Sequence, residues 1–399
     1  MINNISENIN KISNIPTHYN YLYLQNNFDY NNNNINFYNT NSNYNTNNYN
    51  QINSSDIYPK NNNIIEIKEK KPCGIVNYKN NCYLNSGLQI LVSCDKLVEE
   101  LKNYINIKND LINLINDAFH KLLNENIYDS FNFTKYFCKL NDKIFGIQYC
   151  SQNFIRTILS NINNELINFG DKHAIYENSE YFQNIKNSQD KQIEFHKFIK
   201  FIESNNYFIE SKAIKLFSGL SKFFSFGKCL CGEMIIDYSF NYFIDQNLYL
   251  DNIPDNCSFS KLLLLNLGDT INITSECPKC GAEICLKEET KLIKIPEIFI
   301  FTLERYKNCI NNNISIIPEE TIDITNYLDD SVKAKDKKYE YELFGINIRL
   351  GNTIDFGHEI CQVKRNNIWY EMNDTLTYKR TRTYNNNSYG LFYKRKNNI

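Results

Sequence analysis

The spacing of apolar residues divides the chain into a helical first part and a strand-rich second part. In residues 111–122 and 148–162, apolar side chains recur every three or four positions, which places them on one face of a helix. After about residue 215 the spacing becomes that of strands, and residues 291–303 and 339–348 are rich in β-branched and aromatic side chains. This order predicts an α+β fold with a cleft between the helices and the sheet.

Two further segments refine this pattern. Residues 167–210 are more polar and irregular, and we expect an insertion there, or a helix near residues 195–202. Residues 360–363 and 368–372 both have the composition of strands, and the polar segment between them is typical of a hairpin turn. The last part of the chain is therefore expected to contribute paired strands.

The first 70 residues differ in composition from the rest of the chain. They are dominated by Asn, Tyr and Ile and carry almost no net charge. Such a segment cannot bury enough apolar surface to offset the entropy that ordering would cost. We therefore predict a disordered tail over residues 1–70 and a folded domain over residues 71–399. Asn and Ile are abundant along the whole chain, so a bias in base composition is the simplest explanation of the tail.

Composition and charge argue against several classes of protein. The net charge of -2 gives no sign of the basic face that proteins binding nucleic acid or acidic membranes carry. No apolar run approaches the roughly 18 residues of a membrane helix, and the N-terminus does not resemble a signal peptide. The 13 cysteines then favour a reducing compartment, cytoplasmic or nuclear, and thiol or metal chemistry rather than disulfides.

One cysteine stands at the start of an apolar helical pattern. Cys82 follows a loop rich in Asn and Gly, residues 73–81, and leads directly into the helix. A thiol in the first helical turn faces unpaired backbone N–H groups, which favour the thiolate. Gly74 and the asparagines of the loop tolerate left-handed backbone geometry, and Asn77 can direct an N–H group at an oxygen that becomes negative in a transition state. Cys82 is therefore a candidate nucleophile, with Asn77 as a candidate oxyanion donor.

A cysteine nucleophile needs a base and a polar side chain that orients the base. Of the five histidines, only His358 follows a glycine at the start of a predicted strand, where its side chain can stand in a cleft. Asn373 or Asp374, at the end of the neighbouring strand, can accept a hydrogen bond from the imidazole Nδ1–H. A lone histidine is more often structural, but this combination favours His358 as a catalytic base.

Two cysteine pairs suggest a metal site. Cys229 and Cys231 form the first pair, Cys277 and Cys280 the second, and a glycine directly follows each pair. Four thiolates on two turns, joined by strand-like sequence, are the ligands of a zinc ribbon and leave the metal no open position. The first pair is one residue shorter than the usual spacing, and Cys285 is near enough to replace a ligand. The alternative is that these are ordinary buried cysteines.

These blocks, in this order, resemble the ubiquitin-specific proteases, papain-like cysteine deubiquitinases. The likeness extends from about residue 73 to residue 395, and it includes a second helix block at residues 148–166, a strand at 296–306 and a final strand at 389–395. In the cysteine block the shared residues are Gly74, Ile75, Asn77, Asn80, Cys82, Tyr83, Asn85, Ser86, Gln89 and Leu91. In the histidine block they are Gly357, His358, Trp369, Tyr370, Asn373 and Asp374.

The resemblance implies a papain-like fold with three parts. These are a helical thumb at about residues 74–210 and a β-sheet palm at about 211–399, which includes zinc-ribbon fingers at about 225–290. Structural zinc would be held by the two cysteine pairs, and no catalytic cofactor is implied. The implied partners are ubiquitin and ubiquitinated proteins, and the fingers would grip the globular part of ubiquitin.

The resemblance also implies a reaction, hydrolysis of the isopeptide or peptide bond at the C-terminal glycine of ubiquitin. Cys82 would attack the carbonyl carbon, and His358 would act as general base and then as general acid. Asn373 would orient the imidazole, with Asp374 as a supporting or alternative acceptor. Asn77 would stabilise the oxyanion.

Several positions depart from the pattern of the family. Lys79 stands in place of a glycine and could crowd the loop or hold the charge of the thiolate, and Glu359 could raise the pKa of the base. The other departures are Asn81 for Thr, Cys150 and Asn153 for acidic residues, and Arg349 for His. Two alternatives therefore stay open: a ubiquitin-binding protein of the same fold without activity, and a zinc ribbon that assembles with nucleic acid or protein.

Overall fold

The structure, a computed structural model, describes residues 71–396 apart from gaps at residue 106 and at residues 177–178, 206–208, 308–309, 335–336, 352–356 and 382–386. These residues belong to one compact unit that spans Lys68–Ile399. The tail predicted over residues 1–70 lies outside the described residues. Among the described helices, none combines the length and the apolar character that crossing a membrane requires.

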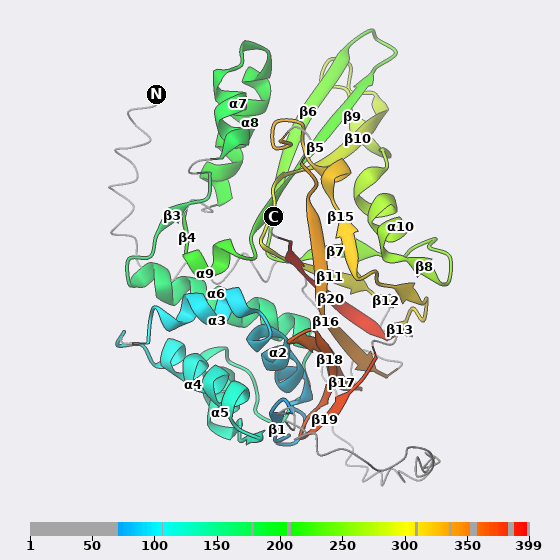
Figure 1. Ribbon diagram of the computed structural model, residues 1–399. Helices are drawn as coiled ribbons and strands as arrows, with labels where there is room; N and C mark the ends of the chain where they lie inside the picture. The colour runs from blue at the N-terminus through cyan, green and yellow to red at the C-terminus, as the bar shows by residue number, and fades with distance from the viewer. Residues whose placement is uncertain are drawn as a thin grey trace. The chain divides into compact units, whose positions relative to one another are not determined.

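Helices occupy the first part of this unit, as the sequence predicts (Figure 1). The two helices expected from apolar spacing are confirmed as α4 and α6, and Leu111, Ile115 and Phe119 of α4 are at most 2% exposed. The segment expected to hold an insertion or a helix forms α7 and α8. The helices are α2 (Cys82–Val92), α3 (Asp95–Lys102), α4 (Asp110–Asn124), α5 (Phe131–Leu140), α6 (Ser151–Asn168), α7 (Glu180–Asn187), α8 (Gln192–Asn205), α9 (Lys212–Lys215) and, later in the chain, α10 (Phe259–Leu263).

Helix α2 is the central helix of this part. All 11 of its residues are buried, because α6 covers one side and strand β17 (His358–Arg365) covers another. A helix whose apolar residues surround its axis is stable only inside a core, and α2 lies where the helical part meets the sheet. Cys82, its first residue, is therefore placed at that junction.

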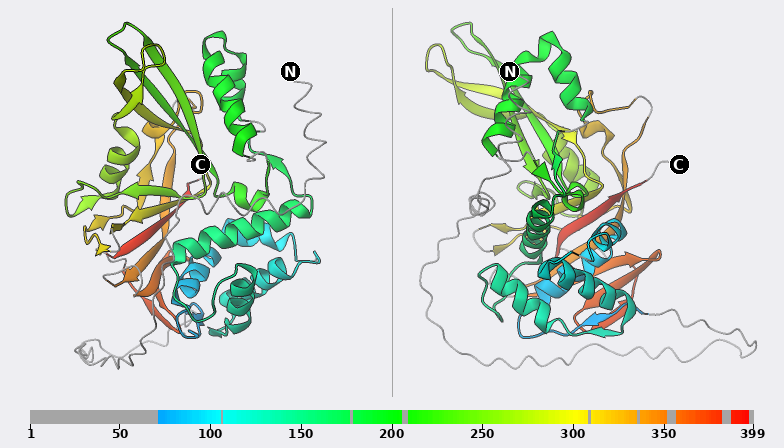
Figure 2. Two further views of the ribbon diagram at one scale, coloured as in Figure 1. Left: turned by 180° about the vertical axis from the view of Figure 1, so that it is seen from behind. Right: turned by 90° about the vertical axis from the view of Figure 1, so that its left-hand side faces the viewer.

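The main sheet has eight strands, and the helices α2–α6 cover one of its faces (Figure 2). Its path runs β19-β18-β17-β16-β20-β11-β7, and β15 pairs with β16 off this path. Besides β17, its strands are β7 (Gln246–Tyr249), β11 (Ile298–Glu304), β15 (Thr321–Asp323), β16 (Glu340–Leu350), β18 (Ile368–Asn373), β19 (Leu376–Lys379) and β20 (Ser388–Arg395).

Strand β11 shows why the central strands of this sheet are apolar throughout. Ile298 and Ile300 belong to the core on the α2 side, whereas Phe299 and Phe301 belong to a second core on the other face. Successive side chains of a strand point to opposite faces, so a strand buried on both sides needs apolar residues at every position. Packing against a core on each face thus fixes the register of the strands in this sheet.

Four pairs of short strands lie outside the two larger sheets of the described residues. They connect loops to the larger elements, and β1 in particular fixes the loop that precedes Cys82. The pairs are β1 (Gly74–Ile75) with β2 (Ile127–Tyr128), β3 (His173–Ala174) with β4 (Ile209–Glu210), β8 (Cys257–Ser258) with β14 (Ile316–Ile317), and β12 (Tyr306–Lys307) with β13 (Ile310–Asn311).

A separate four-stranded antiparallel sheet has the order β6-β5-β10-β9. Its strands are β5 (Gly219–Lys228), β6 (Met234–Phe243), β9 (Ile271–Glu276) and β10 (Glu283–Lys294). This is the region in which the sequence places the two cysteine pairs. Figures 1 and 2 show the sheet extending beyond the main sheet, on the same side as α7 and α8.

Two ion-pair groups connect α8 to this four-stranded sheet. Lys222 of β5 is 8% exposed, and its Nζ lies 2.9 Å from Glu194 Oε1 of α8 and 2.5 Å from Asp329 Oδ2. Lys197 of α8 pairs with Asp237 of β6 at 2.7 Å, but both of these side chains are about half exposed. Both groups therefore join α8 to the four-stranded sheet, but the first is buried and the second is exposed to solvent.

The predicted hairpin near the end of the chain is confirmed. Strands β17 and β18 pair in antiparallel register, with Arg365 opposite Ile368. The two turn residues between them, Asn366 and Asn367, have φ values of 50° and 62°. A two-residue turn with both φ angles positive matches the twist of the paired strands, and Asn tolerates that geometry better than most residues. The hairpin brings the start of β17 next to the end of β18.

Candidate active site

The candidate nucleophile lies at the first position of α2. Cys82 is 3% exposed, and the residue before it, Asn81, occupies the N-cap position without capping the helix through its side chain. The Asn81 side chain instead accepts from the Tyr78 backbone N–H at 2.7 Å and donates to Ser130 Oγ at 3.3 Å and Thr134 Oγ1 at 3.2 Å. Asn81 thereby fixes the loop before Cys82 against α5.

The candidate base lies at the first position of β17. His358 Nε2 is 2.8 Å from Asn373 Oδ1, at the last position of β18, because the hairpin brings these two strand ends together. The nitrogen expected to face Asn373 is Nδ1, and this expectation is wrong. The contact through Nε2 leaves Nδ1 on the other side of the ring, available to a second partner.

Asp374 contacts the cysteine loop and helix α2 through both of its carboxylate oxygens. Asn77 Nδ2 donates to Asp374 Oδ2 at 2.8 Å, and Asn85 Nδ2 donates to Asp374 Oδ1 at 2.8 Å. Asn77 Oδ1 also lies 3.3 Å from the backbone nitrogen of Asn81. These contacts fix which end of the Asn77 amide carries the N–H₂ group, and its second N–H remains for another acceptor.

The thiol of Cys82 does not have the lowered pKa that its place at a helix start predicts. Burial raises the pKa of Cys82 from 9.0 to about 11, and the carboxylates of Glu359 and Asp374 act in the same direction. The backbone N–H groups of Glu359 and Tyr83 face the sulfur and lower the pKa, but by less. Burial therefore outweighs the helix start in setting the pKa of the Cys82 thiol.

Two departures from the family pattern turn out to contact each other. The carboxylate of Glu359 is held by Arg349, whose Nη1 lies 2.6 Å from Glu359 Oε1, and both side chains are buried. Because successive residues of a strand point to opposite faces, Glu359 and His358 direct their side chains apart.

Lys79, another departure from the family pattern, has φ 62°, a geometry that suits glycine, and its aliphatic chain lies against Gly146.

The four predicted metal ligands come together at the tip of the four-stranded sheet. Their sulfur atoms all lie within 4.8 Å of one another, with 3.6 Å between Cys229 and Cys280 and 3.7 Å between Cys231 and Cys277. A tetrahedral zinc site with Zn–S bonds of about 2.3 Å requires sulfur–sulfur distances of roughly 3.8 Å. Cys285 is exposed and lies outside this cluster.

Tight turns explain how each cysteine pair folds back. Gly232 and Gly281, which follow the pairs directly, have φ values of 90° and 71°, and the backbone N–H of each donates to the first cysteine of its own pair. Only glycine adopts such a geometry at little cost. The four cysteine sulfur atoms and the distances between them fit a metal ion that prefers four sulfur ligands, so these four cysteines could hold one.

Comparison with known proteins gives the family. The model of the ubiquitin carboxyl-terminal hydrolase family matches residues 73–393. This protein belongs to that family. The match covers every element of the cluster around Cys82 and both cysteine pairs, and the resemblance inferred from sequence is thereby confirmed.

Individual members of the ubiquitin carboxyl-terminal hydrolase family are similar to this chain at low identity. A probable ubiquitin carboxyl-terminal hydrolase 4 of Schizosaccharomyces pombe is 25% identical over 365 residues, which is 82% of this chain and 59% of that protein. Ubiquitin carboxyl-terminal hydrolase A of Dictyostelium discoideum is 34% identical over 185 residues, 42% of this chain and 21% of that protein. Three other relatives are matched over only 12%, 19% and 27% of their own length.

Solved structures support the fold. A chain of the SAGA DUB module Ubp8/Sgf11/Sus1/Sgf73, bound to monoubiquitin, matches with a TM-score of 0.57 and 16% identity, over 84% of this chain and 73% of that chain. The same module bound to ubiquitin aldehyde matches with a TM-score of 0.57 and 17% identity, over 82% and 70%. The predicted α+β class and its papain-like arrangement of helical part, main sheet and cysteine-bearing sheet are therefore confirmed.

The structure thus groups all five candidate residues of the catalytic cluster: Asn77, Cys82, His358, Asn373 and Asp374. Residues to which the sequence assigned no role in the site complete the cluster. Asn85 lies three positions after Cys82, which places both on the same face of α2, and this spacing was the available signal. The contacts of Asn81 and Glu359 depend on tertiary packing and leave no comparable signal in the sequence.

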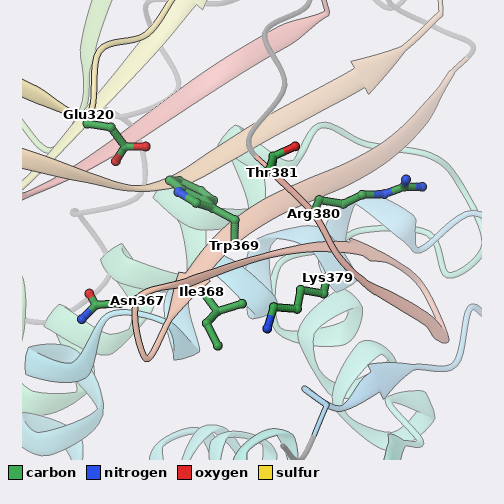
Figure 3. Close-up of a pocket in the computed structure, with 7 residues that line it drawn as sticks. All are labelled: Glu320, Asn367, Ile368, Trp369, Lys379, Arg380 and Thr381. Atoms are coloured by element: carbon green, nitrogen blue, oxygen red, sulfur yellow. The ribbon is translucent and has the colours of Figure 1, made fainter. Parts of the chain in front are cut away.

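A hollow elsewhere on the main sheet is not part of this site. Figure 3 shows it beside the Trp369 indole, which extends toward Glu320. Its volume is about 440 Å³, and it is lined by Glu320, Asn367, Ile368, Trp369, Lys379, Arg380 and Thr381. Ile368 and Asn373 are the first and last residues of β18. The hollow and the catalytic cluster are therefore separated by the length of that strand, roughly 17 Å.

Proposed function

We propose that this protein is a thiol-dependent deubiquitinase, which hydrolyses isopeptide or peptide bonds at the C-terminal glycine of ubiquitin. One observation supports this more than any other. A buried cysteine at a helix start lies beside a strand that begins with a histidine, and the histidine is bound through Nε2 to an asparagine. Cysteine, histidine and asparagine in these roles form the catalytic triad of papain-like proteases.

In the proposed reaction His358 takes the proton of the Cys82 thiol through Nδ1, and the sulfur attacks the carbonyl carbon of the terminal glycine. Asn373 holds the ring through Nε2 and stabilises the imidazolium. The carbonyl oxygen becomes an oxyanion, which accepts from the free N–H of Asn77 and from the backbone N–H of Cys82, unpaired at the helix start. His358 then protonates the leaving amine, and water hydrolyses the thioester to free the enzyme.

Asp374 has a different role in this proposal from the one that the sequence suggested. Its two oxygens bind the amides of Asn77 and Asn85 at 2.8 Å each, so we assign it the task of holding the oxyanion donor. Asn373 alone is assigned to the imidazole. The raised pKa of Cys82 fits this scheme, because the proton has to move to His358 when the substrate arrives.

The four-cysteine cluster is proposed to bind structural zinc. Cys229, Cys231, Cys277 and Cys280 would fill all four positions, so the metal would stabilise the turns and take no part in the reaction. Residues 71–399 would be the catalytic domain, with the thumb at about 74–210 and the palm at about 211–399, including the fingers at about 225–290. Ubiquitin and ubiquitinated proteins are the proposed partners. The 13 cysteines of the sequence fit a reducing compartment, and we propose a cytoplasmic or nuclear location.

The test is hydrolysis of a ubiquitin substrate with a fluorogenic group at its C-terminus. Cys82→Ala is expected to abolish turnover and to leave ubiquitin binding largely intact. Cys94→Ala is a matched control, because Cys94 is also 3% exposed and stands at the N-cap of α3. This control is expected to keep its activity, and unchanged turnover in Cys82→Ala would refute the proposal.

A further inference from the structure

We propose that Arg349 and Glu359 act as one positioning pair, which fixes the backbone around His358 and sets the balance of charge at Cys82. The proposal rests on the proposed role of Cys82 as nucleophile. It concerns two positions at which this chain departs from its family, and it explains why both depart together.

The pair is buried, and the Glu359 carboxylate accepts several hydrogen bonds. Arg349 is 3% exposed and Glu359 is 1% exposed, and their contact joins β16 to β17. Glu359 Oε2 also accepts from the backbone N–H of Ser151 at 3.0 Å, from the Ser151 hydroxyl, and from Asn347 Nδ2 at 3.4 Å. Ser151 is the first residue of α6, so the carboxylate also interacts favourably with the positive end of an 18-residue helix.

These contacts hold the backbone on both sides of His358. The residue after it, Glu359, is bound to the start of α6 through Ser151. The residue before it, Gly357, accepts through its carbonyl oxygen from Gln148 Nε2, in the loop that leads into α6. The Glu359 backbone N–H in turn faces the Cys82 sulfur. A shift of the Glu359 side chain would therefore move the base and one of the groups that stabilise the thiolate.

The charge of the pair matters as much as its position. A carboxylate near Cys82 opposes ionisation of the thiol, and the Arg349 guanidinium offsets it. Replacing Arg349 alone leaves the buried Glu359 carboxylate without its cation, whereas replacing both residues removes both charges. The charged and titratable groups that face Cys82 and the pair come from several elements: Asp374 after β18, Cys150 before α6, and Tyr306 of β12, whose ring centre is 5.7 Å from the Arg349 guanidinium.

The test compares Arg349→Met, Glu359→Gln and the double variant. Two quantities are measured against pH: the rate at which iodoacetamide alkylates Cys82, followed by peptide mass mapping, and kcat/KM for the fluorogenic ubiquitin substrate. Arg349→Met is expected to move the midpoint of alkylation to higher pH by about one unit, and Glu359→Gln to lower pH. The double variant is expected to return close to the parent midpoint, with a lower kcat because the backbone is less well held.

Two further variants separate positioning from simple destabilisation. Arg349→Lys keeps the positive charge, and its pH midpoint of Cys82 alkylation is expected to equal that of the parent protein, even where Arg349→Met folds poorly. Glu342→Gln is the matched control, because Glu342 and Lys364 form another ion pair between β16 and β17, at 2.6 Å and farther along both strands. It should leave the midpoint unchanged.

The proposal would be overturned if the pH midpoint of Cys82 alkylation stayed equal in all variants, or if it moved in the same direction in both single variants. The pair would then have a purely structural role. The alkylation assay needs no ubiquitin. A failure of the proposed function would therefore appear as absent hydrolysis in the parent protein, while the midpoints would still test the pair.

Discussion

Replacing Asp374 by Asn would leave the backbone of the catalytic cluster in place and remove one hydrogen-bond acceptor. Asp374 has φ 51°, a left-handed geometry that Asn tolerates as well as Asp does. Its two oxygens each accept from one amide, that of Asn77 and that of Asn85. An Asn side chain offers one oxygen and one N–H₂ group, so one of the two amides would face a donor instead of an acceptor.

The expected size of the effect of Asp374→Asn on the rate follows from the negative charge of the Asp374 carboxylate. A hydrogen bond to a charged group contributes about 1.5–3 kcal/mol, which corresponds to roughly a 10- to 150-fold change in rate if the whole loss falls on the transition state. Losing an oxyanion donor altogether costs on the order of 10²–10³ in kcat. We therefore expect Asp374→Asn to lower kcat by about 10²-fold with little change in KM, because Asn77 acts on the oxyanion and not on the bound substrate.

The assay is steady-state hydrolysis of the fluorogenic ubiquitin substrate, measured on the plateau of the pH profile. The plateau matters because the Asp374 carboxylate also raises the pKa of Cys82, and its removal favours the thiolate. The neighbouring substitution Asn373→Asp is the control: it keeps an oxygen for His358 Nε2 and should retain most of the activity. The opposite result, a fully active Asp374→Asn and an inactive Asn373→Asp, would refute the assignment of the two residues.

Three other predictions concern stability and metal. The purified protein should contain equimolar zinc that Cys277→Ser loses, and metal analysis finding no zinc in the parent protein would contradict the ligand assignment. Lys222→Met should lower the free energy of unfolding in urea by about 3–5 kcal/mol, because it leaves buried carboxylates unpaired, whereas the exposed Lys197→Met should cost at most about 1 kcal/mol; equal losses would contradict this. Gly390→Ala would place Cβ against the side-chain nitrogen of Gln152, so calorimetry should show about 1–3 kcal/mol of destabilisation, and an unchanged transition would show that this contact relaxes freely.

Much of the fold could be predicted from local pattern. Helices α4 and α6 carry their apolar residues at helical spacing, and the Asn-Asn turn between β17 and β18 has the chemistry that a two-residue hairpin needs. The cysteine pairs carry their own turns, because a glycine follows each of them. These features depend on residues near one another in sequence, so the sequence alone was sufficient to predict them.

The details of the site depend on tertiary contacts and could not be predicted in this way. The helix dipole favours a thiolate at Cys82, but the burial of α2 by α6 and β17 outweighs it and raises the thiol pKa. The choice of Nε2 over Nδ1 follows from the orientation of the His358 ring toward the end of β18. The contact between Arg349 and Glu359 requires the register of β16 and β17, in which these two residues are direct partners. A pattern of residue types does not specify that register.

The most direct test of the central claim uses ubiquitin that carries an electrophile at its C-terminus. If Cys82 is the nucleophile of a deubiquitinase, the protein will gain the mass of one ubiquitin, peptide mapping will locate the bond at Cys82, and Cys82→Ala will form none while Cys94→Ala still reacts. A protein that binds this ubiquitin tightly without forming an adduct would instead be a catalytically silent binder. An adduct on another cysteine would show that the nucleophile is misassigned.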